Sequence, residues 1–107
     1  MRAYVREFLD RFVENFAELG IETSSLVLFG SHAKGTAKLS SDIDIAVVES
    51  VPLTSLERGI LRGIGEEIDE RIEVNLFFTT PQALQDAKDV FDTNMYIRDE
   101  GLVLWPL

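Results

Sequence analysis

Apolar and polar residues alternate along the chain in patterns that predict several helices and strands. Apolar residues recur at helical spacing over residues 4–19, which predicts an amphipathic helix that ends at Gly20. The unbroken apolar run at residues 26–29 is too short for a helix and predicts a buried strand, and residues 42–48 predict a second strand. The small and polar residues between them predict a loop with a short helix that begins at Ser31.

The second half of the chain predicts another helix and strand, then a helical region and a last strand. Thr54 and Glu57 have the spacing of a capping box, so a helix is expected from there to about Glu70. The later elements are expected as a strand over residues 71–78, a helical region over residues 80–97 in one or two pieces, and a strand over residues 102–105. This order predicts an α/β fold in which a mixed β-sheet is flanked by α-helices.

Length and composition indicate one globular domain over residues 1–107. A chain of 107 residues with 46% hydrophobic and 27% charged residues has the size and composition of a single hydrophobic core. Its apolar runs are far shorter than the roughly 20 residues that cross a bilayer, and the N-terminus shows no apolar signal segment. Without cysteine the chain forms neither disulfides nor cysteine-ligated zinc sites, and the cytoplasm is the expected compartment.

The charge balance is strongly acidic and bears on the kind of partner. The chain has 19 acidic and 10 basic residues, which give a formal net charge of −9. Stable binding to a nucleic acid is therefore not expected, because such affinity comes mostly from Lys and Arg side chains that neutralise phosphates. A basic partner, or a small anion that arrives with a metal ion, stays open.

Carboxylates in neighbouring predicted strands form the first candidate site. Asp42 and Asp44 are two positions apart, so both project from one face of a strand. Such close like charges repel each other unless a cation lies between them, and oxygen ligands favour Mg²⁺ or Mn²⁺ over zinc. Glu73, in the next predicted strand, would complete an acidic cluster if the two strands pair side by side. Asn75 points the same way, so a register shift of two residues would exchange the roles of Glu73 and Asn75.

A glycine and a serine after the first predicted strand form the second candidate feature. Gly30 has no side chain to keep a phosphate from the backbone, and the N–H groups and the Ser31 hydroxyl at a helix start can bind phosphate oxygens. Lys34 would add a positive charge one turn later. Metal-binding carboxylates that face such a phosphate cradle describe a site for a nucleoside triphosphate and its magnesium.

The ordered combination of these motifs is similar to a known family. Residues 28–35, followed by residues 41–45, resemble the signature of the DNA polymerase β-type nucleotidyltransferase superfamily, and in particular its minimal nucleotidyltransferases. The likeness extends to residues 71–74, where the family usually has a third carboxylate, and to residues 99–105, which resemble its usual C-terminal ending. The resemblance implies the nucleotidyltransferase fold.

The resemblance also implies roles for individual residues. The implied nucleotide-binding residues are Gly30, Ser31, Lys34 and Ser41. The implied catalytic and metal-binding residues are Asp42, Asp44 and Glu73. Glu73 would act as the third ligand or as a base, and it stands where the family usually has Asp. Lys34 stands where Arg is commoner, which preserves the charge but loses the bidentate fork of a guanidinium.

The implied activity is attack of an acceptor hydroxyl on the α-phosphorus of a nucleoside triphosphate by a two-metal mechanism, with AMP transferred from ATP and pyrophosphate released.

Minimal nucleotidyltransferases are commonly paired with HEPN-domain proteins in toxin–antitoxin modules. The implied partner is therefore a HEPN-domain toxin whose tyrosine hydroxyl accepts AMP. The alternative is a binding module that neutralises its partner by docking alone, and nucleotidylation of an antibiotic is a weaker one. The nucleotide preference and the oligomeric state, a homo-oligomer included, stay open.

Three other features have simpler interpretations. His32 is expected to be an exposed residue of the first helical turn rather than a general base. Trp105 is expected to pack against the domain. The acidic run at residues 66–70 is expected to form a solvated helix face.

Overall fold

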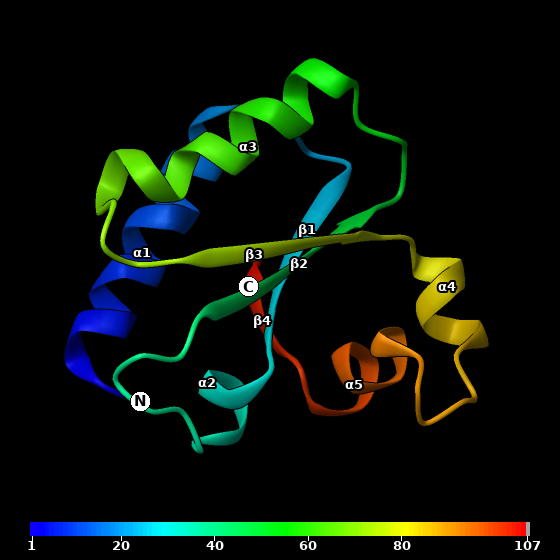
Figure 1. Cartoon of the computed structure of the whole chain (residues 1–107). Coiled ribbons are helices and arrows are strands. Elements are labelled where there is room, and N and C mark those ends of the chain that lie inside the picture. The colour runs from blue at the N-terminus through cyan, green and yellow to red at the C-terminus, as the bar shows by residue number, and fades with distance from the viewer. Residues whose placement is uncertain (107) are drawn as a thin grey trace.

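The computed structural model describes residues 1–106 and arranges them as helices on both faces of one β-sheet (Figure 1). In chain order, the elements are α1 (Ala3–Glu18), β1 (Ser24–Phe29), α2 (Ser31–Lys34), β2 (Ile43–Glu49), α3 (Ser55–Ile68), β3 (Val74–Thr79), α4 (Pro81–Asp86), α5 (Thr93–Glu100) and β4 (Leu102–Trp105). This arrangement confirms the expected α/β fold. None of the helices within residues 1–106 combines the length and the hydrophobicity that crossing a bilayer requires.

The sheet is mixed and has the strand order β3-β2-β1-β4. Strand β1 pairs antiparallel with β2 and with β4, whereas β2 and β3 are parallel. Two parallel strands require a crossover connection, and α3 provides it between the end of β2 and the start of β3. The first residues of β2 and β3 therefore meet the last residues of β1 at one end of the sheet.

Side chains that alternate along β2 pack into a larger and a smaller hydrophobic layer. On one face, Ile43, Ile45 and Val47 are buried under the apolar stripes of α1 and α3. On the other face, Ala46 and Val48 lie in a smaller cluster with α5. The larger layer dominates stability, because a fully buried Val, Leu, Ile or Phe side chain contributes roughly 1.5–3 kcal/mol. Helix α1 alone buries Val5, Phe8, Leu9, Phe12 and Phe16.

Local sequence signals set most of the boundaries around α3 and β3. The capping box forms in both directions between Thr54 and Glu57, with N···O distances of 2.9 and 3.1 Å, and α3 begins at the next residue after Thr54. The strand expected from residue 71 begins only at Val74. Arg71 is held in a turn instead, because its backbone N–H and its guanidinium both donate to the carboxylate of Asp69 at 3.0 Å. These hydrogen bonds lower the pKa of Asp69.

The helical region after β3 is broken into two pieces. Helix α4 ends at Asp86, and α5 begins only after Asp92 caps it by accepting a hydrogen bond from the N–H of Asn94 at 2.9 Å. The intervening loop carries Phe91, which is 91% exposed. The helical region expected over residues 80–97 is therefore in two pieces, and Val90 and Phe91 belong to neither of them.

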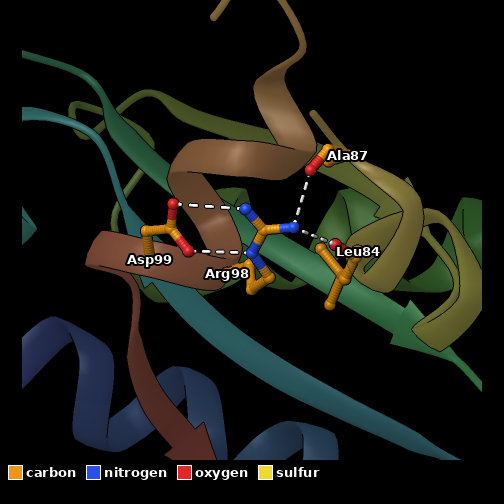
Figure 2. A network of polar contacts seen from close by, with 4 residues as sticks. All are labelled: Leu84, Ala87, Arg98 and Asp99. Carbon is orange, nitrogen blue, oxygen red and sulfur yellow. Dashed lines mark hydrogen bonds and ion pairs between the residues drawn. The ribbon is translucent and has the colours of Figure 1, made fainter. Parts of the chain in front are cut away.

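An arginine of α5 fastens the two short helices to each other (Figure 2). The guanidinium of Arg98 donates hydrogen bonds to the carbonyl oxygens of Leu84 at 3.0 Å and Ala87 at 2.7 Å, at the C-terminal end of α4. It also pairs with the carboxylate of the adjacent Asp99 at 2.8 Å. The hydrogen bond between these two side chains lowers the pKa of Asp99 and raises the pKa of Arg98.

Candidate active site

The two aspartates lie at the end of the sheet where β1 ends and β2 begins. Asp42 comes directly before β2, and Asp44 is the second residue of that strand. Asp44 pairs in register with Phe29 of β1 and with Asn75 of β3. Because side chains alternate along a strand, both carboxylates project from the face opposite Ile43, and both are half-buried. The expected placement of Asp42 and Asp44 on one face is confirmed.

Asn75 joins the two carboxylates. Its side-chain nitrogen donates hydrogen bonds to Oδ2 of Asp42 and to Oδ1 of Asp44, each at 3.2 Å. The register of the parallel strands places Asn75 beside Asp44, so the amide reaches both acids from the neighbouring strand. Each carboxylate keeps a second oxygen that Asn75 does not engage. The sequence left open whether residue 73 or residue 75 lies against the two aspartates. In the structure, Asn75 is the residue that contacts both of them.

Glu73 lies before β3 and has an exposed side chain. Its carbonyl oxygen accepts a hydrogen bond from the N–H of Ile43 at 2.9 Å, which extends the pairing of the two strands toward Asp42. Glu73 and Asp42 both line a small cleft of about 150 Å³. Within residues 1–106, however, no three His, Cys, Asp or Glu side chains come close enough to hold a metal ion together. The role of Glu73 as the third acidic residue stays a prediction.

The backbone turns sharply at Gly30, and this corner lies close to the carboxylate of Asp44. Its backbone has φ +76°, in the region that favours glycine, and a Cβ at this position would overlap the carboxylate of Asp44. Glycine is therefore needed both for the backbone turn and for the close approach of the acid. Ser31 follows at the start of α2, and the N–H of Lys34 donates to the carbonyl oxygen of Gly30 at 3.1 Å.

Lys34 reaches from α2 to α5 rather than into open solvent. Its Nζ pairs with a carboxylate oxygen of Glu100 at 3.0 Å and lies 5.3 Å from the centre of the Tyr96 ring. Both members of the ion pair are nearly half exposed, and such pairs contribute about 1 kcal/mol or less. A phosphate group can therefore compete with Glu100 for this ammonium at small cost.

His32 and Ser41 hold the loop between β1 and β2. The Ser41 hydroxyl accepts a hydrogen bond from the N–H of Lys38 at 2.9 Å, and its carbonyl oxygen lies 3.1 Å from Nε2 of His32. Because a carbonyl only accepts, Nε2 of His32 carries the proton in this contact. The His32 side chain is 6% exposed, so the expectation of an exposed residue is wrong. It positions Ser41, the residue that leads into Asp42.

The donor set at this corner fits a small divalent cation. Asp42 and Asp44 supply carboxylate oxygens on one face, and such ligands suit Mg²⁺ or Mn²⁺. The side chain of Asn75 offers either its N–H₂ group or, after a rotation, its oxygen. Gly30 leaves the neighbouring backbone open to a bulky anion. The arrangement can thus bring a metal ion and a phosphate chain together.

Comparisons with known proteins show the family to which the chain belongs. The profile of the nucleotidyltransferase domain family matches residues 5–97. A relative from Methanocaldococcus jannaschii, named "putative protein adenylyltransferase", is 36% identical over 72 residues, and the match covers 65% of this chain and 47% of that protein. The chain therefore matches about half the length of this curated relative.

Two solved structures share the fold. A crystal structure of a toxin–antitoxin with AMP-PNP superimposes with a TM-score of 0.59 and 26% sequence identity, over 90% of this chain and 72% of that one. A mutant of the toxin–antitoxin MntA-HpeT superimposes with a TM-score of 0.57 and 23% identity, over 89% of this chain and 70% of that one. The second likeness bears on the fold alone.

Proposed function

The chain belongs to the nucleotidyltransferase domain family, and from that premise we propose that it transfers AMP from ATP to a hydroxyl group of a partner protein. The observation that carries this proposal is the pair Asp42 and Asp44, joined by Asn75 beside the corner at Gly30. Two carboxylates on one face, next to a backbone without a side chain, suit a metal-bound triphosphate.

The comparisons support the donor and the kind of acceptor. A relative that is 36% identical is named for adenylyl transfer to protein, and a solved structure of the same fold is a toxin–antitoxin with the ATP analogue AMP-PNP. We therefore propose ATP as the donor and a toxin protein as the acceptor. A HEPN-domain protein with an accessible tyrosine is the specific partner that the sequence resemblance adds.

Asp42 and Asp44 would hold the divalent cations, Mg²⁺ or Mn²⁺. When bound, such ions supply positive charge to the α-phosphate and the leaving pyrophosphate and lower the pKa of the acceptor hydroxyl. Around them, the open backbone at Gly30 and the Ser31 hydroxyl would hold phosphate oxygens. Lys34 would exchange Glu100 for a phosphate, which keeps its charge paired. Ser41, fixed by His32, would set the position of Asp42.

The transfer forms one bond and breaks another at the α-phosphorus. The acceptor oxygen bonds to this phosphorus, the bond to the bridging oxygen of the β-phosphate breaks, and pyrophosphate leaves. The hydroxyl proton requires an acceptor, and the Asn75 amide is not basic. Glu73 lies one residue before β3, beside Asp42, with an exposed carboxylate. We propose Glu73 as the group that receives the proton.

A labelling experiment tests the proposal. The chain is incubated with Mg²⁺, ATP labelled on the α-phosphate, and the protein encoded by the neighbouring gene. Label is expected on that protein, and the variant Asp42→Asn/Asp44→Asn is expected to lose it. The exposed pair Asp10 and Glu14 on α1 gives a control, because Asp10→Asn/Glu14→Gln removes the same charge far from the site.

Two outcomes would contradict transfer of AMP. One is label that persists in the double aspartate variant, since the site would then not be responsible. The other is label that appears only with ATP labelled on the γ-phosphate, which indicates transfer of a phosphoryl group. A variant with Glu73→Gln separates the proposed base from the metal ligands, because it should reduce the rate and retain binding of Mg²⁺ and ATP.

One observation favours a second candidate function, neutralisation of the partner by docking alone. The position that contacts both aspartates holds an amide, so the site unites two acids rather than three. If the variant Asp42→Asn/Asp44→Asn still neutralises the partner completely in a growth assay, docking is sufficient and the transfer is dispensable.

A further inference from the structure

A groove on the far side of the α1–α3 layer has no role in the site described above. It measures about 690 Å³ and lies between the C-terminal half of α1 and the outer face of α3. Its walls include three apolar side chains that are unusually open to solvent: Leu19 is 40% exposed, Leu56 74% and Ile60 44%. Helices α1 and α3 run beside each other on the face of the sheet opposite the two aspartates (Figure 1).

Two glycines in the middle of α3 line the same groove. Glycine weakens a helix interior relative to alanine, and neither position has a backbone reason for it, since neither has a positive φ. A Cβ added at Gly59 or Gly63 would meet nothing within 4 Å. Gly65 differs, because its Cβ would touch Val74 at 3.2 Å and Phe8 at 3.6 Å. The fold itself therefore explains Gly65, whereas Gly59 and Gly63 only keep side chains out of the groove.

The charges around the groove indicate the sign of its occupant. Glu18 of α1 and Glu67 of α3 line it, and the whole chain has a net charge of −9. Two copies that met through this face would bring like charges together, because a two-fold interface uses the same patch twice. A partner with basic side chains beside an apolar surface would find complementary charge.

We propose that this groove binds an amphipathic helix of a partner protein, with Lys or Arg beside its apolar face. Its apolar side chains pack on Leu19, Leu56 and Ile60, and its backbone approaches closely over the two glycines. Its basic side chains pair with Glu18 and Glu67. Laying one helix face into an apolar groove is a recurrent mode of peptide recognition. Because the groove lies across the sheet from Asp42 and Asp44, docking leaves the aspartates uncovered.

Binding is measured by fluorescence anisotropy with the full chain and without nucleotide, so the result does not depend on transfer. The probes are three synthetic peptides of about 18 residues, long enough for about five helical turns. One is an amphipathic Leu/Lys helix, one has the same pattern with Glu in place of Lys, and one has the Leu/Lys composition in scrambled order. The ordered Leu/Lys peptide is expected to bind at least about tenfold more tightly than either of the others.

Variants of the chain then locate the binding site. Leu56→Ser/Ile60→Ser should weaken the Leu/Lys peptide about tenfold. The loop variant Val90→Ser/Phe91→Ser should not, although it also removes two exposed apolar side chains. Equal effects of the two variants, or equal binding of the ordered and scrambled peptides, would overturn the proposal.

The glycines provide a second test that a merely structural role would not pass. Gly59→Ala/Gly63→Ala should raise the melting temperature of the free chain, because alanine favours the helix. The same variant should bind the Leu/Lys peptide less tightly, because two methyl groups enter the groove. Unchanged or tighter binding overturns the proposal. A dimer of the free chain that Leu56→Ser/Ile60→Ser dissolves overturns it too, since the occupant would then be a second copy.

Discussion

Replacing Gly30 with alanine should damage both the stability of the fold and the binding of metal. The backbone of Gly30 has φ 76° and ψ −155°, a combination almost restricted to glycine. The new methyl group would also overlap the carboxylate of Asp44 and displace it from Asn75. Gly35 offers a matched control five residues later. It has φ 78°, and a Cβ there would meet nothing within 4 Å.

The two substitutions should lower the stability of the fold by different amounts. Alanine in the left-handed conformation of Gly35 costs about 1 kcal/mol. At Gly30 the backbone cost is about 1–3 kcal/mol, and loss of a hydrogen bond to a carboxylate adds about 1.5 kcal/mol. Gly30→Ala should therefore lose about 3 kcal/mol, or roughly 10–20 °C in melting temperature for a domain of this size. Most domains have 5–15 kcal/mol of stability, so the variant should still fold.

Urea unfolding followed by the fluorescence of Trp105, the sole tryptophan, measures the loss of stability. Titration calorimetry with Mn²⁺ measures the site. Gly35→Ala should keep the affinity for Mn²⁺ of the unmodified chain, and Gly30→Ala should lose most of it. If the two variants lose equal stability and bind Mn²⁺ equally well, the contact between Gly30 and Asp44 does not shape the site.

Three further predictions concern other parts of the structure. Asn75→Asp should lower the melting temperature without metal, because it places a third carboxylate beside those of Asp42 and Asp44. It should also enlarge the stabilisation by Mg²⁺ in scanning fluorimetry. An unchanged effect of Mg²⁺ would contradict the geometry. The guanidinium of Arg58 donates to the buried carboxylate of Glu49 at 3.1 and 2.8 Å. Arg58→Ala should therefore lower the free energy of unfolding in urea by about 3 kcal/mol. A loss below about 1 kcal/mol would show that Glu49 finds other partners. Arg98 lowers the pKa of Asp99 from 3.8, so the contribution of Asp99 is present above that pH and is lost as the pH falls through the lowered value. Thermal melts at decreasing pH should therefore show a smaller acid-induced loss of stability for Asp99→Asn, and parallel curves would refute this.

The fold was largely predictable because its strongest signals are local. The helical spacing of Phe8, Phe12 and Phe16 and the capping box at Thr54 each involve residues a few positions apart, and both formed as expected. The predicted start of β3 was less accurate. The residues around Arg71 have a strand-like pattern, but the hydrogen bond from its N–H to Asp69 holds Arg71 in a turn. Periodicity alone does not reveal such a side-chain contact with the backbone.

The site was predictable only as far as spacing within one strand determines it. The interval between Asp42 and Asp44 sets their common face wherever the strand lies. The contacts of Asn75 span 33 and 31 residues, and they depend on which strands pair and in which register. The ion pair of Lys34 with Glu100 depends on how α5 packs against the rest of the domain. The local sequence around either residue contains no signal that predicts this pair.

The acidic charge of the chain sets a condition on how this site can bind a nucleotide. A net charge of −9 repels a free triphosphate, and Asp42 and Asp44 add to that repulsion at the corner itself. Lys34 of α2 is already paired with Glu100, and the amide of Asn75 joins the aspartates without neutralising them. In the proposed function, positive charge would therefore arrive with the ligand. In the proposed function, the same two carboxylates that repel a bare triphosphate would attract one that carries divalent cations, so the site would select its substrate by charge before any contact reads the base.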